Sequence, residues 1–409
     1  RFARLGMVSG AVFSDLDSDG FPELVLACDW GPIRIFRNDR GRLSEWDAPI
    51  SGELPSNSPD GRAAEIPPGS RLSRLTGWWA GVATGDLDGD GRLDIVASNW
   101  GLNSRYRPSL GSPIWIHYGD MTGSGGVDII ESYINPATGK EVPRRGMRPV
   151  VAAFPFVVEK AATLEAYGKA TVHELFGERL AGSAAVEATT LASVVFINRG
   201  DHFEALPLPP EAQWSPAFGI CIADFDGDGC EDVFLSQNFF AVNPDEWRHD
   251  AGRGLLLRGD GRGGLSPMPG QASGIKVYGE QRGCAVGDYD TDGRPDIVVT
   301  QNGNETKLFH NVSGKPGLRV RCVGPLGNPT GIGATVRLRF RSGRFGAPRE
   351  IQSGSGYWSR NSDTLVLATP EPPAEVWVRW PGGHEVSGPI PANAREIALD
   401  TNGNARTIR

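Results

Sequence analysis

The chain has 409 residues, with 41 basic and 49 acidic side chains and a formal net charge of −8. This length exceeds the size at which a single hydrophobic core usually stops growing, so two domains are expected. The sequence lacks the basic stripe that nucleic-acid binding requires, and no stretch approaches the roughly 20 apolar residues of a membrane-spanning helix.

Glycine (55 residues) and proline (31 residues) punctuate short apolar runs along the chain, which predicts an all-β architecture. In the first unit, the apolar run 11–13 leads into an acidic loop, which reads Asp15-Leu-Asp17-Ser-Asp19-Gly20-Phe21-Pro-Glu23. Strands are predicted after it at 23–27 and 33–38. Ca²⁺ takes six to eight oxygen ligands, and this loop offers carboxylates at positions 1, 3, 5 and 9 and a backbone carbonyl at position 7. The glycine at position 6 permits the sharp turn.

Three more copies of this loop follow, and each leads into an apolar strand rather than the helix of an EF-hand. The predicted calcium ligands of the four copies are Asp15, Asp17, Asp19, Phe21 and Glu23; Asp86, Asp88, Asp90, Arg92 and Asp94; Asp224, Asp226, Asp228, Cys230 and Asp232; and Asp288, Asp290, Asp292, Arg294 and Asp296. Asp-Gly clusters also form hairpin turns, but a turn does not need four carboxylates within nine residues, and these repel one another without a cation. Four Ca²⁺ ions would also balance the formal charge of −8.

A fifth, weaker copy of the loop begins at Asp120. Its predicted ligands are Asp120, Thr122, Ser124, Gly126 and Asp128. Because it keeps only two carboxylates, this copy either binds calcium weakly or stays empty, and both alternatives remain open.

The order of acidic loop, strand and Phe-x-Asn element recurs along the chain, as in 36–38 and 309–311. Repeats of this size with period-two strands indicate a β-propeller with five motif-bearing units. The total number of blades stays open, with six or seven as the expectation. Good helix formers at helical spacing predict a helical insertion at about 155–182.

After Pro316 the acidic loops stop and short alternating runs of apolar and polar residues follow, separated by Gly, Pro and Asn turns. This pattern predicts a small antiparallel sandwich or barrel. The expected domains are therefore a propeller over 1–315 and a β domain over 316–409.

The five cysteines are widely spaced and fit buried small hydrophobic residues better than a disulfide framework. Cys221 and Cys284 precede their acidic loops by three and four residues, so they should face opposite sides of their strands. Because millimolar Ca²⁺ is an extracellular condition, we expect an extracellular, cell-surface or periplasmic protein. The chain begins at Arg1 rather than at Met, which favours a processed product or a fragment.

No catalytic constellation is visible in the sequence. The six histidines are isolated, and neither a GxSxG elbow nor a P-loop occurs. The eleven tryptophans are in excess, and some of them, such as Trp78, Trp79 and Trp100, lie at predicted strand ends. There they either pack between blades, which we favour, or form a stacking platform for sugars.

Together the four strong loops and their strands resemble the FG-GAP or VCBS repeats of bacterial surface proteins and of the integrin α-subunit propeller. The segments 327–334, 353–359 and 376–383 resemble the ASPIC/UnbV domain. This order of domains is similar to that of cartilage acidic protein and its bacterial relatives. The resemblance implies an exported calcium-binding scaffold for adhesion or assembly, without catalytic activity.

Accordingly, we predict a non-enzymatic protein that binds a protein partner or a second copy of itself, through the helical insertion and the C-terminal domain. A carbohydrate-binding or carbohydrate-active propeller, similar to a lyase or dehydratase, is the alternative. A glycan ligand therefore stays open, whereas nucleic acid and a membrane span are not expected.

Overall fold

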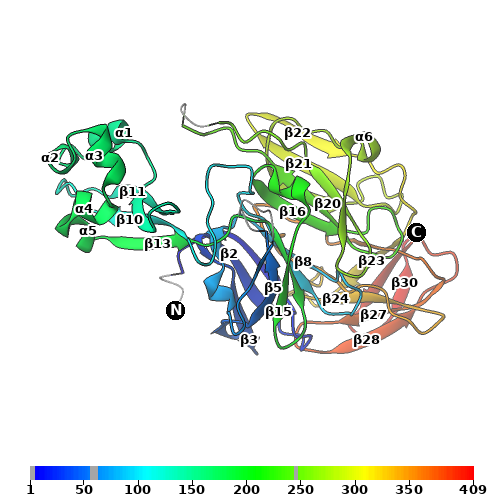
Figure 1. Ribbon diagram of the computed structural model, residues 1–409. Coiled ribbons are helices and arrows are strands. Elements are labelled where there is room, and N and C mark those ends of the chain that lie inside the picture. Colours follow the sequence, from blue (N-terminus) through cyan, green and yellow to red (C-terminus); the bar gives the residue numbers. More distant parts are fainter. Residues whose placement is uncertain (1–4, 56–62, 244–246) are drawn as a thin grey trace.

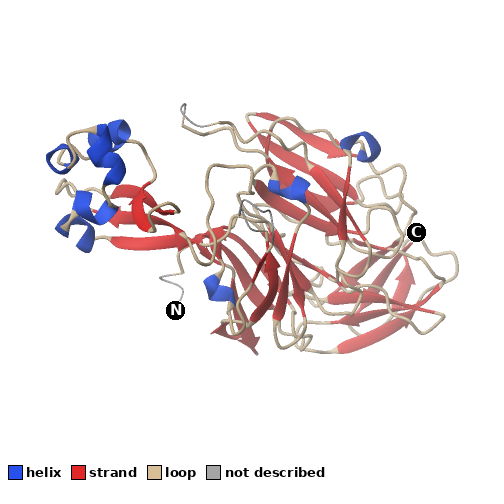
Figure 2. Cartoon of the chain, in the orientation of Figure 1, coloured by secondary structure: helices blue, strands red, loops and turns tan. Residues whose placement is uncertain are grey.

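The computed structural model describes residues 5–55, 63–243 and 247–409. Strands account for 42% of the residues and helices for 9%, so the expected predominance of β structure is confirmed. Most of the helices gather in one lobe, at the left of Figure 2. Among the described residues, no helix is both long and apolar enough to cross a membrane.

Four successive sheets form the body of the molecule (Figure 1). The first contains β1 (Met7–Ser14), β2 (Glu23–Pro32), β3 (Arg34–Asp39) and β4 (Arg42–Trp46), with β7 (Thr76–Trp78) on β2. The second contains β8 (Val82–Gly85), β9 (Asp94–Ala97), β14 (Val194–Asn198) and β15 (Phe203–Pro207), extended by β5 (Ile50–Leu54) and β6 (Ala64–Glu65). The third contains β16 (Ala217–Ala223), β17 (Asp232–Gln237), β18 (Leu255–Gly259) and β19 (Leu265–Met268). The fourth contains β20 (Glu280–Gly287), β21 (Asp296–Asn302) and β22 (Asn304–Phe309). Short helices η1 (Leu72–Arg74), η2 (Pro210–Gln213) and α6 (Gly270–Ser273) connect strands of the body.

The first strands of these sheets lie side by side, with β1 next to β8, β8 next to β16 and β16 next to β20. Apolar side chains fill the spaces between successive sheets. On β9, Ile95 belongs to the core between the first and second sheets, and Val96 to the core between the second and third. This alternation is the period of two that a strand buried on both faces requires. No closed barrel is found among the described residues, so the propeller and its number of blades both stay predictions.

A separate lobe is inserted into the second sheet, because β9 and β14 pair directly although about a hundred residues separate them. Its sheet contains β10 (Ile114–Gly119), β11 (Asp128–Asn135), β12 (Lys140–Pro143) and β13 (Ala184–Ala188). Its helices are α1 (Met147–Ala153), α2 (Val157–Lys160), α3 (Leu164–Lys169), α4 (Val172–Phe176) and α5 (Glu178–Ala181). The lobe therefore contains the expected helical segment at 155–182, but it also contains four strands and begins earlier.

The lobe has a hydrophobic core of its own, which includes Met121, Ile130, Phe154 and Phe176. It projects from the body in Figure 1 and contacts the first sheet through β13. The fifth acidic loop joins β10 to β11 inside this lobe. The four strong loops lie in the four successive sheets of the body, whereas the fifth loop lies in the sheet of the lobe.

The C-terminal domain consists of two four-stranded sheets that share one core, which includes Val320, Val336, Val378 and Ile397. One sheet contains β23 (Leu318–Val323), β26 (Leu365–Leu367), β29 (Glu396–Asp400) and β30 (Ala405–Thr407). The other contains β24 (Thr335–Phe340), β25 (Arg349–Glu350), β27 (Pro373–Arg379) and β28 (Glu385–Pro389). The expectation of a purely antiparallel domain is wrong, because β23 and β29 pair in parallel. The expected boundary at 315/316 lies between β22 and β23.

All five cysteines are free thiols, and all except Cys230 are buried, as expected of small hydrophobic residues. Cys221 and Cys284 lie in the same core, between the third and fourth sheets, with their sulfur atoms 3.1 Å apart. Because the two residues occupy opposite faces of equivalent strands in neighbouring sheets, they face each other.

Candidate metal centre

Each strong acidic loop joins the first strand of its sheet to the second, so the four loops occupy equivalent places on the body. In all four, the position-1 carboxylate accepts a hydrogen bond from the N–H of the position-6 glycine, at 2.7–3.1 Å. These glycines, Gly20, Gly91, Gly229 and Gly293, have φ between 87° and 97°. Such a backbone favours glycine, which explains the fixed residue at this position.

The position-9 carboxylate ties each loop to the rest of its sheet. Glu23, Asp94, Asp232 and Asp296 are at most 3% exposed. Each accepts a hydrogen bond from the N–H of position 2, at 2.9–3.1 Å. Each also accepts one from a backbone N–H at the end of the third strand, at 2.8–3.3 Å, and the donors are Asn38, Asn198, Gly259 and Asn311.

These contacts give the Phe-x-Asn element its structural role. In the second sheet the element is Phe196-Ile197-Asn198, which the inserted lobe separates from its acidic loop in the sequence. The Asn198 side chain donates to the carbonyl oxygens of Leu93 (3.1 Å) and Leu16 (2.8 Å), and thereby links the first two acidic loops. Sequence reasoning missed Asn198, although the repeated pattern was a usable signal.

Carboxylates from each strong loop come together at one point. Three of them offer oxygens within 4.8 Å of one another in each loop, and the sets are Asp15, Asp17 and Asp19; Asp86, Asp88 and Asp90; Asp224, Asp226 and Asp232; and Asp288, Asp290 and Asp296. Clusters made only of oxygen donors suit a hard cation such as Ca²⁺. At the fourth loop, His310 also approaches Asp290 and Asp292.

Asp15 provides an observation independent of the clustering. It is 2% exposed, and its Oδ1 atom is buried without a hydrogen-bond partner among the described residues. Its other oxygen, Oδ2, bonds to the Gly20 N–H and pairs with Arg379 at 2.8 Å. Buried acceptors are almost always satisfied, so the free oxygen is suited to act as a cation ligand. The predicted donors at this loop therefore fit the ion.

Burial disfavours the ionised form of several loop carboxylates and therefore raises their pKa values. It raises the pKa of Glu23, Asp94 and Asp232 to about 7, and that of Asp86 and Asp224 to about 6. The charges of neighbouring carboxylates in the same loop act in the same direction and contribute to these pKa values. A bound cation would favour the ionised forms, because its charge opposes both effects.

Arginine side chains at the outer edge of the loops are another source of positive charge, besides a cation, for the loop carboxylates. Arg258 pairs with Asp226 (2.7 Å) and Asp228 (2.8 Å), and it is 53% exposed. Arg92 pairs with Asp90 at 2.5 Å. Exposed pairs of this kind stabilise weakly, and they reach only the outer carboxylates.

The fifth loop differs from the four strong ones. Asp128 accepts hydrogen bonds from the backbone N–H and the hydroxyl of Thr122, both at 2.8 Å, and Asp120 is exposed. Within the part of the chain that the structure describes, its residues form no cluster of three ligands.

The C-terminal domain covers the side of the body that carries the strong loops, and it brings one arginine to each of them. The contacts are Arg379 with Asp15, Arg337 beside Asp86 and Gly91, Arg349 with Glu231, and Arg319 with Asp288. Backbone hydrogen bonds accompany them, from the Gly382 N–H to the Gly20 carbonyl and from the Gly317 N–H to the Gly293 carbonyl, both at 2.8 Å. Sequence analysis did not single out these arginines.

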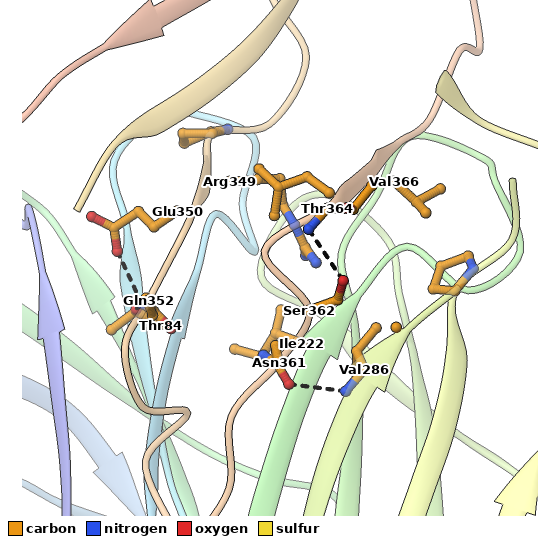
Figure 3. A pocket seen from close by; sticks show the side chains of 14 residues that line it. Thr84, Ile222, Val286, Arg349, Glu350, Gln352, Asn361, Ser362, Thr364 and Val366 are labelled. Atoms are coloured by element: carbon orange, nitrogen blue, oxygen red, sulfur yellow. Dashed lines mark hydrogen bonds between the residues drawn. The ribbon is translucent and has the colours of Figure 1, made fainter. Parts of the chain in front are cut away.

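Behind the loops, residues of the C-terminal segment 348–366 line a small cavity together with Thr84 of the second sheet, Ile222 of the third, Val286 and Gly287 of the fourth, and Pro295 of the fourth loop (Figure 3). The cavity has a volume of about 50 Å³. Ligand pockets are typically about 300–1,000 Å³, so this space is too small for a substrate. Glu350 here accepts hydrogen bonds from the Ser14 hydroxyl (2.6 Å) and the Asp15 N–H (2.8 Å), and burial raises its pKa to about 7.

Two family models match the chain. One, described as an FG-GAP-like repeat, covers residues 15–97, and the other, described as ASPIC and UnbV, covers residues 324–402. The resemblance inferred from the sequence is therefore confirmed for these segments. No curated protein matches the sequence.

Among solved structures, rhamnogalacturonan lyase YesW is 11% identical over 95% of this chain and 76% of its own, with a TM-score of 0.21. Rhamnogalacturonan lyase PL11 of Bacillus licheniformis is 12% identical over 95% and 76%, with a TM-score of 0.19. A Tc holotoxin pore of Photorhabdus luminescens is 15% identical over 77% and 14%, with a TM-score of 0.18. Similarities this low carry no functional argument.

Proposed function

Because the chain joins an FG-GAP-like repeat to an ASPIC and UnbV domain, we propose that it is an exported calcium-binding scaffold. The observation that carries this proposal is the buried, unpartnered Oδ1 atom of Asp15 within a cluster of three carboxylates. The same nine-residue geometry in three further loops supports it. Arg379 pairs with the other oxygen of Asp15 and leaves this one without a partner among the described residues.

The four sheets act, in this proposal, as blades of a propeller that the C-terminal domain completes. Support comes from the order of the first strands, β1, β8, β16 and β20, and from the segment 353–362. The adjoining Gln352 side chain donates a hydrogen bond to the Thr84 hydroxyl of β8, and Asn361 of this segment accepts one from the Val286 N–H of β20. Calcium in the loops would stiffen the surface on which the C-terminal domain rests.

Binding rather than catalysis is the proposed role, because the clustered carboxylates are committed to the cations and to backbone N–H groups. The proposed location is extracellular, on the cell surface or periplasmic, where calcium is abundant enough to load loops of moderate affinity. Partners would be a protein or a second copy of the chain.

Thermal unfolding with and without calcium tests the proposal. A cation that binds only the folded protein stabilises it by about 2.7 kcal/mol per site at a hundred times its dissociation constant. We expect excess EDTA to lower the melting temperature and Ca²⁺ to restore it. An unchanged melting curve would contradict calcium binding.

Matched variants assign the effect to the loops. Asp17→Asn removes one exposed ligand of the first loop with little change in shape, and it should reduce the calcium stoichiometry measured by titration calorimetry. Asp120→Asn, in the fifth loop, is the control and should leave the binding of the four strong loops unchanged. Equal effects of both variants would count against the assigned ligands.

A further inference from the structure

Two cysteines lie next to each other in the core between the third and fourth sheets. The sulfur atoms of Cys221 and Cys284 are 3.1 Å apart. A disulfide bond needs about 2.05 Å between its sulfurs, so a shift of about 1 Å brings the two thiols to bonding distance. Cys28 and Cys322 belong to other hydrophobic clusters, and Cys230 lies in the third acidic loop. The pair is therefore set apart from the other three cysteines.

The other two interfaces between successive sheets have aliphatic residues at the place of this cysteine pair. At each interface, the residue three before the acidic loop of one sheet shares a core with the residue four before the loop of the next sheet. The pairs are Val12 with Val82, Ala83 with Ile220, and Cys221 with Cys284. Aliphatic side chains thus fill this place twice in the same molecule, so packing alone does not require two thiols.

Hydrogen bonds hold the backbone around the two cysteines. The Gly219 N–H donates to the Ser236 hydroxyl at 2.7 Å, and this hydroxyl donates to the Arg282 carbonyl oxygen. A Cβ atom on Gly219 would lie only 3.0 Å from the Cys284 sulfur, so glycine leaves room for that sulfur. The strands β16, β17 and β20 therefore fix the positions from which the two thiols approach each other.

From this arrangement, we propose that Cys221 and Cys284 form a disulfide bond, which joins the third sheet to the fourth. Disulfides form and persist in oxidising compartments outside the cytoplasm. The proposal therefore rests on the export that is part of the proposed function, but it does not depend on calcium in the loops. The bond would connect residues 63 positions apart. Closing so long a loop restricts the unfolded chain, which stabilises the folded one.

Thiol–disulfide exchange supplies the oxidation. The thiolate of one cysteine attacks a sulfur of an external disulfide, which is oxidised glutathione or the disulfide of a carrier protein, and releases one thiol. The thiolate of the second cysteine then attacks the protein sulfur of the mixed disulfide and releases the second thiol. The two cysteine thiols lose two protons and two electrons in total, and the external disulfide gains them as it becomes two thiols.

Burial determines when the bond forms. Cys221 and Cys284 are both buried, and burial raises the pKa of the Cys284 thiol well above its usual range. Exchange needs a thiolate that the external disulfide can reach. The bond therefore forms while the chain folds, before this core closes. For the same reason, the completed bond should resist reductants until the protein unfolds.

Refolding of the full chain tests the proposal. Reduced, unfolded protein is refolded with Ca²⁺ and a mixture of oxidised and reduced glutathione, and is then unfolded in N-ethylmaleimide without reductant. Its intact mass should show three maleimide adducts, on Cys28, Cys230 and Cys322, and five adducts when reduction precedes alkylation. Cleavage at aspartate should release two peptides joined through Cys221 and Cys284. Five adducts without reductant, or a bond to another cysteine, would overturn the proposal.

Cys221→Ala is the test variant, because Ala83 occupies the equivalent place in the second sheet. It should show four adducts with and without prior reduction. Cys322→Ala removes a buried thiol outside the pair and is the matched control, with two adducts before reduction and four after it.

Melting temperatures measure the contribution of the bond to stability. Wild-type protein refolded in reduced glutathione alone should melt about 5 °C below the oxidised protein. Cys322→Ala should keep this difference and Cys221→Ala should lose it, whatever each substitution does to the absolute melting temperature. An equal difference in Cys221→Ala would overturn the proposal. A protein that melts in a calcium-dependent way but keeps five reactive thiols would overturn the disulfide and leave the proposed function standing.

Discussion

At the scale of single residues, the four strong loops place carboxylates where water has little access. The position-9 group is buried, held by two backbone N–H groups, and serves the fold of its sheet whether or not a cation is present. At position 1 of the first loop, the buried Oδ1 atom of Asp15 has no hydrogen-bond partner among the described residues, so a ligand at this atom would remove an unfavourable burial. In the first loop, Glu23 is thus engaged by the fold of its sheet, whereas Asp15 keeps one oxygen free for a ligand.

This division predicts an unusual pH dependence for the calcium-free protein. Glu23, Asp94 and Asp232 have folded-state pKa values of about 7, against ordinary values of 4.5 for Glu and 3.8 for Asp. Between about pH 4 and 7 the folded state therefore holds protons that the unfolded chain has released, so the free energy of unfolding falls as pH rises through this window. Each pKa unit corresponds to about 1.4 kcal/mol.

Melting temperatures at pH 5 and pH 8 in EDTA check this prediction, and the value at pH 8 should be lower. With excess Ca²⁺ the order should reverse, because the ion binds the carboxylates in their ionised form. The control is Asp94→Asn, which removes one titrating group and should flatten the dependence measured in EDTA. A melting temperature that rises with pH in EDTA would contradict the assigned pKa shifts.

At the scale of elements, the inserted lobe is a unit with its own core. Met121, Phe154 and Phe176 pack with one another, and no residue of this cluster belongs to the clusters of the body. The two ends of the lobe meet, because Ile114 and Ala188 are paired in the register of β10 and β13. Insertion is therefore compatible with the direct pairing of β9 and β14.

Removing the whole lobe should leave the body folded. In the proposed variant a Gly-Gly linker replaces residues 115–187, and we expect its melting temperature to stay within a few degrees of the parent because the body keeps its core. A shorter deletion of residues 157–181 should lower the melting temperature more than the larger deletion, because it exposes Met121 and Ile130 of the lobe core. Failure of the larger deletion to fold would show that the body needs the lobe.

At the scale of the whole molecule, the acidic loops are also a domain interface. Arg349 of the C-terminal domain reaches Glu231, which is 3% exposed and belongs to the third loop. Burial raises the pKa of Glu231 to about 7, and Arg349 opposes this rise. The body and the C-terminal domain are therefore coupled through charges that have little contact with water.

Arg349→Ala should destabilise the protein by about 3–5 kcal/mol, because it leaves a buried carboxylate without its partner. Arg360→Ala is the control: it breaks an exposed pair with Asp363, whose loss should cost less than about 1 kcal/mol. Chemical denaturation monitored by tryptophan fluorescence measures both. Similar small losses for the two variants would indicate that the interface does not depend on the Arg349–Glu231 pair.

The sequence by itself determined the acidic loops, the strands that follow them, most strands of the C-terminal domain (but not β28 and β30) and the helical character of 155–182. These features are local: a nine-residue loop needs only its own glycine and carboxylates, and a strand needs only its alternation. The pairing of β9 with β14, the arginine at each loop and the contact of Cys221 with Cys284 were decided by the tertiary structure. Each joins residues that are distant in the chain, and their contact depends on how whole sheets pack, which no local pattern specifies.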